Sequence, residues 1–134
     1  MAMEWNEKYS VSVSSIDYEH KKLFQMINEL SDAMRSGKGS GIAPEILKRL
    51  AAYTQEHFAH EEKMMVRAGY ANYATHKVEH DKLTKQVVEL MRDYDNKKVV
   101  LSVSLLDFLQ RWLSTHILSC DKQYVAPMQA AGVR

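Results

Sequence analysis

The sequence predicts an all-α fold: an antiparallel up-down-up-down four-helix bundle with an extended N-terminal arm. Apolar residues recur every three or four positions in four segments of ~20 residues, which is the period of a helix with one buried face. Short polar or glycine-containing stretches separate these segments, and short connections favour antiparallel neighbours. The chain has 134 residues, a length typical of one domain, so we expect a single domain over residues 1–134.

Helix-breaking and helix-capping residues set the expected limits of each element. We expect an arm over residues 1–16 and helices over about 17–36, 44–66, 72–94 and 100–123. Asp17 is a residue type that caps helix N-termini, although it could instead orient His20. Pro44 suits the first position of a helix. Residues 37–41 are rich in glycine and are interpreted as a flexible turn.

The two ends of the chain carry weaker signals. Val11 and Val13 alternate with serines, as in an extended segment laid over a bundle, and Trp5 would anchor that segment. Pro127 interrupts the last helical pattern, so we expect a loose tail after the fourth helix.

Charge and composition exclude several classes of function. The chain carries 18 basic and 17 acidic residues without a block of either sign, which argues against a nucleic-acid partner. Its apolar runs are much shorter than the ~18 residues of a spanning helix, so we expect no membrane insertion. The N-terminus shows no secretory signal, and we expect a cytoplasmic protein. The single cysteine, Cys120, excludes an internal disulfide and a cysteine-cage zinc site.

Five of the six histidines and one glutamate lie on the apolar stripes of the predicted helices. Burying one unpaired polar group costs roughly 1–3 kcal/mol, and an unpaired carboxylate costs more, against a total stability of ~5–15 kcal/mol. A metal cluster would offset the cost of burying all of these groups together, because neutral imidazole is the commonest metal ligand and a carboxylate can bridge two cations. These residues are His20, His57, Glu61, His76, His80 and His116.

Other interpretations of these residues are weaker. A lone histidine on an apolar stripe is usually an ordinary core residue, but here all four helices contribute at compatible depth. The segment from His60 to Met64 begins like the zinc-peptidase motif H-E-x-x-H and lacks its second histidine. Ferritin-like di-iron bundles need Glu-x-x-His on two helices, and the sequence contains no such motif. Imidazole also suits zinc, copper and nickel, so the residue types leave the metal open.

Taken in order, the histidine motifs resemble those of the hemerythrin family, and the N-terminal arm resembles its bacterial members. The resemblance covers essentially the whole chain. Each motif alone is weak, but the ordered set of seven ligand positions is specific. The motifs are His20-Lys-Lys-Leu-Phe, His57-Phe-Ala-His-Glu61-Glu, His76-Lys-Val-Glu-His80 and His116-Ile-Leu-Ser-Cys-Asp121.

The resemblance implies two iron ions (Fe2+ or Fe3+) joined by an oxo or hydroxo bridge. One iron would take three histidines, the other would take two, and two carboxylates would bridge both. The two-histidine iron would then keep an open position, as reactive metal sites do. The implied ligands of the first iron are His76, His80 and His116, and those of the second are His20 and His57. The implied bridging carboxylates are Glu61 and Asp121. The implied lining of an oxygen pocket is Phe58, Trp112, Leu113 and Ile117.

The function implied by the resemblance is reversible dioxygen binding for oxygen transport, storage or delivery, without enzymatic activity. One alternative is a sensor of oxygen, redox state or nitric oxide that acts through a partner protein. Two minor alternatives are a di-iron enzyme that reduces peroxide or nitric oxide, and iron handling without gas chemistry. We expect dioxygen as the ligand, a monomer, and an oxygen-consuming or signalling protein as the partner.

Three residues around the motifs need separate interpretation. Asp121 lies five residues after His116, which is ~140° around an ideal helix and off the stripe. We therefore predict that the last helix widens into a π-turn or ends early near Ser119. His60 is interpreted as a surface residue or a support for the ligands. Cys120 is interpreted as a small buried thiol, with a redox role as the alternative.

Overall fold

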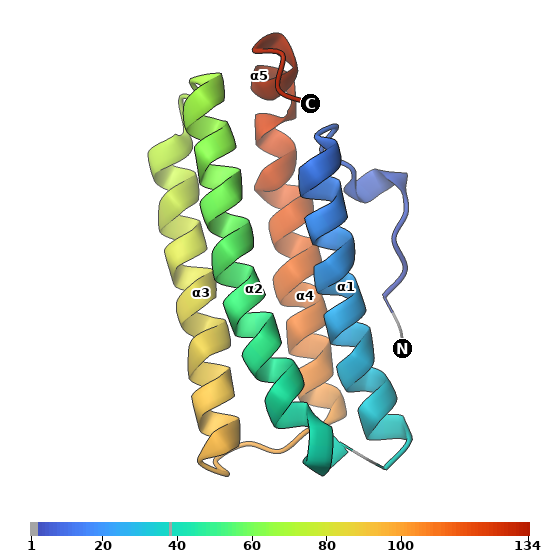
Figure 1. Cartoon of the computed structure of the whole chain (residues 1–134). Coiled ribbons are helices and arrows are strands. Elements are labelled where there is room, and N and C mark those ends of the chain that lie inside the picture. The colour runs from blue at the N-terminus through green and yellow to red at the C-terminus, as the bar shows by residue number, and fades with distance from the viewer. Residues whose placement is uncertain (1–2, 38) are drawn as a thin grey trace.

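The computed structural model describes residues 3–37 and 39–134, and four long helices dominate it. Successive long helices run in opposite directions, and each is joined to the next at one end of the bundle (Figure 1). The prediction of an all-α, antiparallel four-helix bundle is therefore confirmed. The four helices are α1 (Ser14–Arg35), α2 (Gly39–Ala68), α3 (Tyr73–Asp95) and α4 (Val103–Ser119).

The arm lies along the outside of α1, as predicted, and contains one short 3-10 helix, η1 (Glu7–Tyr9). The backbone of Met3 exchanges two hydrogen bonds with the Asn28 side chain, at 2.7 and 2.9 Å. The Trp5 ring packs edge-on against Phe24, with 5.6 Å between ring centroids. The arm therefore covers one side of the bundle with apolar side chains, which the Met3 and Trp5 contacts hold against α1.

The first helix begins earlier than predicted, and Asp17 is not its cap. Helix α1 starts at Ser14, and Val13 occupies the N-cap position without a side-chain hydrogen bond. The Asp17 carboxylate accepts hydrogen bonds from the Ser10 hydroxyl at 2.6 Å and the Val11 amide at 2.9 Å. Asp17 therefore fastens the arm to the helix, a role that depends on a tertiary contact and not on local propensity.

The second helix also begins earlier than predicted. Helix α2 starts at Gly39, so Pro44 lies inside it, and the predicted turn over residues 37–41 is wrong from Gly39 onward. Lys38 lies outside the described residues. A proline within a helix removes one backbone hydrogen bond. Ala43 is fully buried just before the proline, so packing against the bundle extends the helix where local signals would begin it later.

The C-terminal part differs from the prediction in two ways. The fourth helix covers 103–119 and not 100–123; Ser102 caps it by accepting a hydrogen bond from the Leu105 amide at 3.2 Å. The chain then forms a 3-10 helix, η2 (Asp121–Tyr124), and a short helix, α5 (Val125–Ala130). The predicted loose tail is wrong, because Met128 is fully buried and packs with the end of the bundle.

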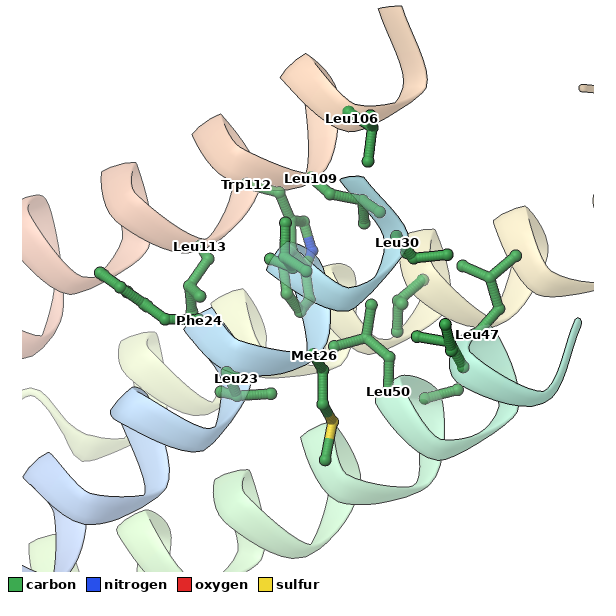
Figure 2. Close-up of a cluster of buried hydrophobic side chains, with 14 of the residues drawn as sticks. Leu23, Phe24, Met26, Leu30, Leu47, Leu50, Leu106, Leu109, Trp112 and Leu113 are labelled. Atoms are coloured by element: carbon green, nitrogen blue, oxygen red, sulfur yellow. The ribbon is translucent and has the colours of Figure 1, made fainter. Parts of the chain in front are cut away.

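Two apolar clusters fill the bundle and leave a polar layer between them. The large cluster occupies most of the bundle and includes leucines from α1, α2 and α4 around Trp112 (Figure 2). The small cluster joins the arm, the ends of the helices and the C-terminal segment; it comprises Val11, Val13, Ile16, Met65, Tyr70, Tyr124, Met128 and Val133. Along helix α1 the three layers follow one another: Ile16 belongs to the small cluster, His20 to the polar layer and Leu23 to the large cluster.

Replacing Asp17 with alanine should release the arm. Both hydrogen bonds to the arm are lost, and we expect the free energy of unfolding to fall by ~1–3 kcal/mol. Amide hydrogen exchange should show reduced protection at Val11. The matched control is Asp81→Ala, because Asp81 is 68% exposed and pairs with Lys77 one turn away on the surface of α3. This change should cost less than ~0.5 kcal/mol. Unchanged protection of the Val11 amide in Asp17→Ala would contradict the assigned role.

Candidate metal centre

The polar layer contains all seven residues that the sequence motifs singled out. Every long helix contributes at least one, and each of the seven side chains is at most 5% exposed. Helix α1 supplies His20, and η2 supplies Asp121 just beyond the end of α4. The others are His57 and Glu61 in α2, His76 and His80 in α3, and His116 in α4.

The early end of α4 brings Asp121 into the layer. The Cys120 amide donates to the His116 carbonyl at 2.8 Å, which completes the last helical turn. The chain then tightens into η2, and the Asp121 side chain is fully buried. An ideal helix would place Asp121 ~140° from His116, away from the other ligands. The prediction that α4 ends near Ser119 is confirmed, in the form of an early end followed by a 3-10 turn.

The five imidazoles point their Nε2 atoms at two carboxylates. The Glu61 Oε2 atom lies 3.4 Å from His20 and 3.6 Å from His57. The Glu61 Oε1 atom lies 2.9 Å from His80 and 3.9 Å from His76. One oxygen of Glu61 therefore faces the α1 and α2 histidines, while the other faces the α3 histidines.

Asp121 divides its oxygens in the same way. Its Oδ2 atom lies 3.2 Å from the Nε2 atom of His20. Its Oδ1 atom lies 3.0 Å from the Nε2 atoms of both His76 and His116. Both carboxylates thus span the same two sets of histidines, so each set has an oxygen of Glu61 and an oxygen of Asp121 beside it.

The ligand atoms form two groups of unequal size that share Glu61. Within each group the candidate atoms lie within 4.8 Å of one another. With the exception of the Thr54 hydroxyl, the buried side-chain nitrogens and oxygens without a hydrogen-bond partner among the described residues belong to these ligands. Unpartnered buried imidazole and carboxylate atoms in this arrangement fit metal ions, iron included. The groups are Glu61, His76, His80, His116 and Asp121, and His20, His57 and Glu61.

Mutual electrostatics hold the centre together in the metal-free protein. Burial alone would lower the pKa of His20, but the Asp121 and Glu61 carboxylates raise it to about 9. Burial also opposes protonation of His116, yet Asp121 raises its pKa well above the usual value. Against the effect of burial, the neighbouring histidines hold the pKa of Asp121 and of Glu61 below their usual values. Protonated imidazoles therefore balance the two carboxylates, and these protons must leave when a metal binds.

Three supporting residues were not predicted from the sequence. Glu62 lies 2.8 Å from His80 Nδ1, and Glu19 lies 2.7 Å from His57 Nδ1. Such contacts fix the orientation of a ligating imidazole. The buried Tyr124 hydroxyl donates a hydrogen bond to Glu61 at 2.6 Å. For Glu19 and Glu62 the sequence offered one signal that could have identified them, because each is next to a predicted ligand in the sequence.

The two ambiguous residues of the sequence also have definite places. His60 Nδ1 lies 2.9 Å from Glu19 Oε2, so His60 supports the carboxylate that contacts His57. This agrees with the interpretation of His60 as a support for the ligands. Cys120 is only half-buried, so the expectation of a buried thiol is wrong. The early end of α4 leaves Cys120 beside a surface cavity that His76 also lines.

The four residues predicted to line an oxygen pocket are buried next to the centre. The Phe58 ring stacks on His80 with 3.9 Å between centroids and 5° between planes. The Trp112 indole donates to the Leu83 carbonyl at 3.3 Å and so joins α4 to α3. Leu113 and Ile117 belong to the same large cluster, on either side of His116 in α4. The large cluster therefore presents an apolar wall to the metal centre.

The metal-free protein should lose stability as the pH rises from 6.5 to 9. The folded-state pKa of His20, about 9, exceeds its usual value of 6.5, so its contribution is complete below pH 6.5 and disappears as the pH passes 9. Circular dichroism melting curves of the metal-free protein would show a falling Tm across this interval. The variant His20→Gln should show a shallower decline. A Tm that stays level or rises between pH 6.5 and 9 would contradict this account.

Comparisons with known proteins agree with this geometry. The hemerythrin HHE cation binding domain matches residues 11–126. The bacteriohemerythrin of Methylococcus capsulatus is 34% identical over 123 residues, which cover 91% of this chain and 93% of the relative. A bacteriohemerythrin of Pseudomonas aeruginosa is 35% identical over 121 residues, which cover 90% of this chain and 78% of the relative. The crystal structure of a wild-type hemerythrin superposes with a TM-score of 0.87 at 31% identity, over 96% of this chain and 98% of that chain. The chain belongs to the hemerythrin family.

Proposed function

We propose that this chain holds two iron ions and binds dioxygen reversibly, in a role of oxygen transport, storage or delivery. The observation that carries the proposal is the division of the two carboxylates. Glu61 and Asp121 each direct one oxygen to His20 and the other to the α3 histidines. A pair of cations held side by side accounts for this arrangement. A single ion would contact only one oxygen of each carboxylate and only one set of histidines.

The ligands divide unequally between the two ions in this proposal. His76, His80 and His116 hold one iron, and His20 and His57 hold the other. Glu61 and Asp121 bridge both, together with an oxo or hydroxo group. The smaller ligand group on the α1 and α2 side favours an open coordination position there. Bound ferrous iron supplies the electrons that dioxygen binding needs.

The protein's own contribution is to orient the ligands and to exclude water. Glu19 and Glu62 hold the rings of His57 and His80 so that Nε2 faces the centre. Phe58 and the rest of the apolar wall line this side of the centre with apolar side chains. A dry site disfavours proton leakage and the loss of bound oxygen as superoxide.

A binding role is favoured over an enzymatic one by the ligand set. The centre has five histidines and two carboxylates, whereas ferritin-like di-iron proteins rely mainly on carboxylates. We therefore propose dioxygen itself as the ligand, with no separate substrate. Among the helices of residues 3–37 and 39–134, none is long and apolar enough to cross a membrane.

The test is an oxygenation cycle followed by visible spectroscopy. The protein is loaded with ferrous iron without air, exposed to air and then purged with argon. We expect two irons per chain and a charge-transfer band that appears with oxygen and disappears when oxygen is removed. Irreversible oxidation on the first exposure would contradict a carrier role and favour a redox sensor or an enzyme.

Two histidine variants make the cycle specific to the assigned ligands. His116→Ala removes a proposed ligand and should lose the reversible band and at least one iron. His60→Ala removes a histidine that is not a proposed ligand and acts on the centre through Glu19 and His57, so it should still bind two irons and show the reversible band, with at most a modest loss of iron affinity. Equal behaviour of the two variants would contradict the ligand assignment.

A further inference from the structure

One buried polar atom next to the centre has no assigned role. The hydroxyl of Thr54 is fully buried and has no hydrogen-bond partner among the residues that the structure describes. The other buried unpartnered side-chain atoms of the described residues belong to the proposed metal ligands. A helical threonine usually donates to a carbonyl in the preceding turn. A hydroxyl that is buried without that bond destabilises the metal-free fold unless a ligand uses it.

The position of Thr54 on α2 places it at the boundary between the metal centre and the large apolar cluster. The inward face of α2 carries Leu50, then Thr54, then His57 and Phe58, all of them buried. Residues three and four apart on a helix have Cβ atoms about 5–6 Å apart. One turn further along α2, Thr54 therefore has two neighbours: the proposed iron ligand His57 and Phe58 of the apolar wall.

The side of the centre that Thr54 borders is the side with fewer ligands. His57 belongs to the smaller group, with His20 and Glu61. If the open coordination position lies with that group, as the proposed function holds, a ligand bound there extends into the region of the apolar wall and Thr54. A hydroxyl can donate and accept hydrogen bonds, and a donor in low-dielectric surroundings acts more strongly than in water.

We propose that the Thr54 hydroxyl donates a hydrogen bond to the small ligand that binds on the His57 side of the centre, and so sets that ligand's affinity and residence time. The ligand class is a two- or three-atom molecule that carries negative charge when bound, with dioxygen as the physiological case and azide as a probe. This inference rests on the proposed function and adds a specificity-determining residue to it.

The test compares Thr54→Val, which keeps the shape and removes the hydroxyl, with Thr54→Ser, which keeps the hydroxyl. In the diiron protein, azide titration should show affinity about 10- to 100-fold weaker for Thr54→Val, the effect of losing a hydrogen bond to a charged group. Thr54→Ser should stay within a few-fold of the parent. Dioxygen should also leave Thr54→Val faster.

A second readout uses the metal-free protein. Because the hydroxyl lacks a partner there, Thr54→Val should melt at the same temperature as the parent or several degrees higher. Azide affinity equal to the parent's in Thr54→Val would overturn the proposal. A lower melting temperature in metal-free Thr54→Val would also overturn it, because the hydroxyl would then have a structural or water-held partner. Iron analysis of the parent protein separates failure of the proposed function from failure of the Thr54 proposal. A parent protein that binds fewer than two irons contradicts the proposed function itself.

Discussion

Burial of five imidazoles and two carboxylates in one layer constrains the rest of this structure. Unpartnered polar groups in a protein core cost free energy, so the seven side chains must meet one another or a metal. Meeting requires all four long helices to present the layer at the same height, with Asp121 brought in from beyond α4. The two apolar clusters on either side then seal the layer from water. The register of the helices at this layer and the early end of α4 follow from this requirement.

The same constraint connects distant segments to the centre. Tyr124 is fully buried in the small cluster, and its hydroxyl donates to Glu61. Met128 of α5 belongs to that cluster, so the C-terminal segment covers one face of the polar layer. The arm contributes Val11 and Val13 to the same cluster. Segments that seem peripheral in the sequence are therefore part of the enclosure that a water-excluding site needs.

Helical periodicity was sufficient to predict the bundle and to place six of the seven central residues, because each lies on an apolar stripe. Asp121 lies off that stripe, and its place followed from resemblance and from the predicted early end of α4. Periodicity failed where tertiary partners override local signals: Asp17 binds the arm, the packing of Ala43 extends α2 past its proline, and Met128 packs the tail. Glu19 and Glu62 were missed because their partners, His57 and His80, lie in other helices.

The most direct test of the central claim is a crystal structure of the iron-loaded protein with anomalous data collected at the iron absorption edge. The account predicts two anomalous peaks inside the bundle, one among His76, His80 and His116 and one beside His20 and His57. Each peak should lie next to one oxygen of Glu61 and one oxygen of Asp121. A single peak, or iron bound outside this layer, would contradict the claim that the two carboxylates bridge a pair of metal ions.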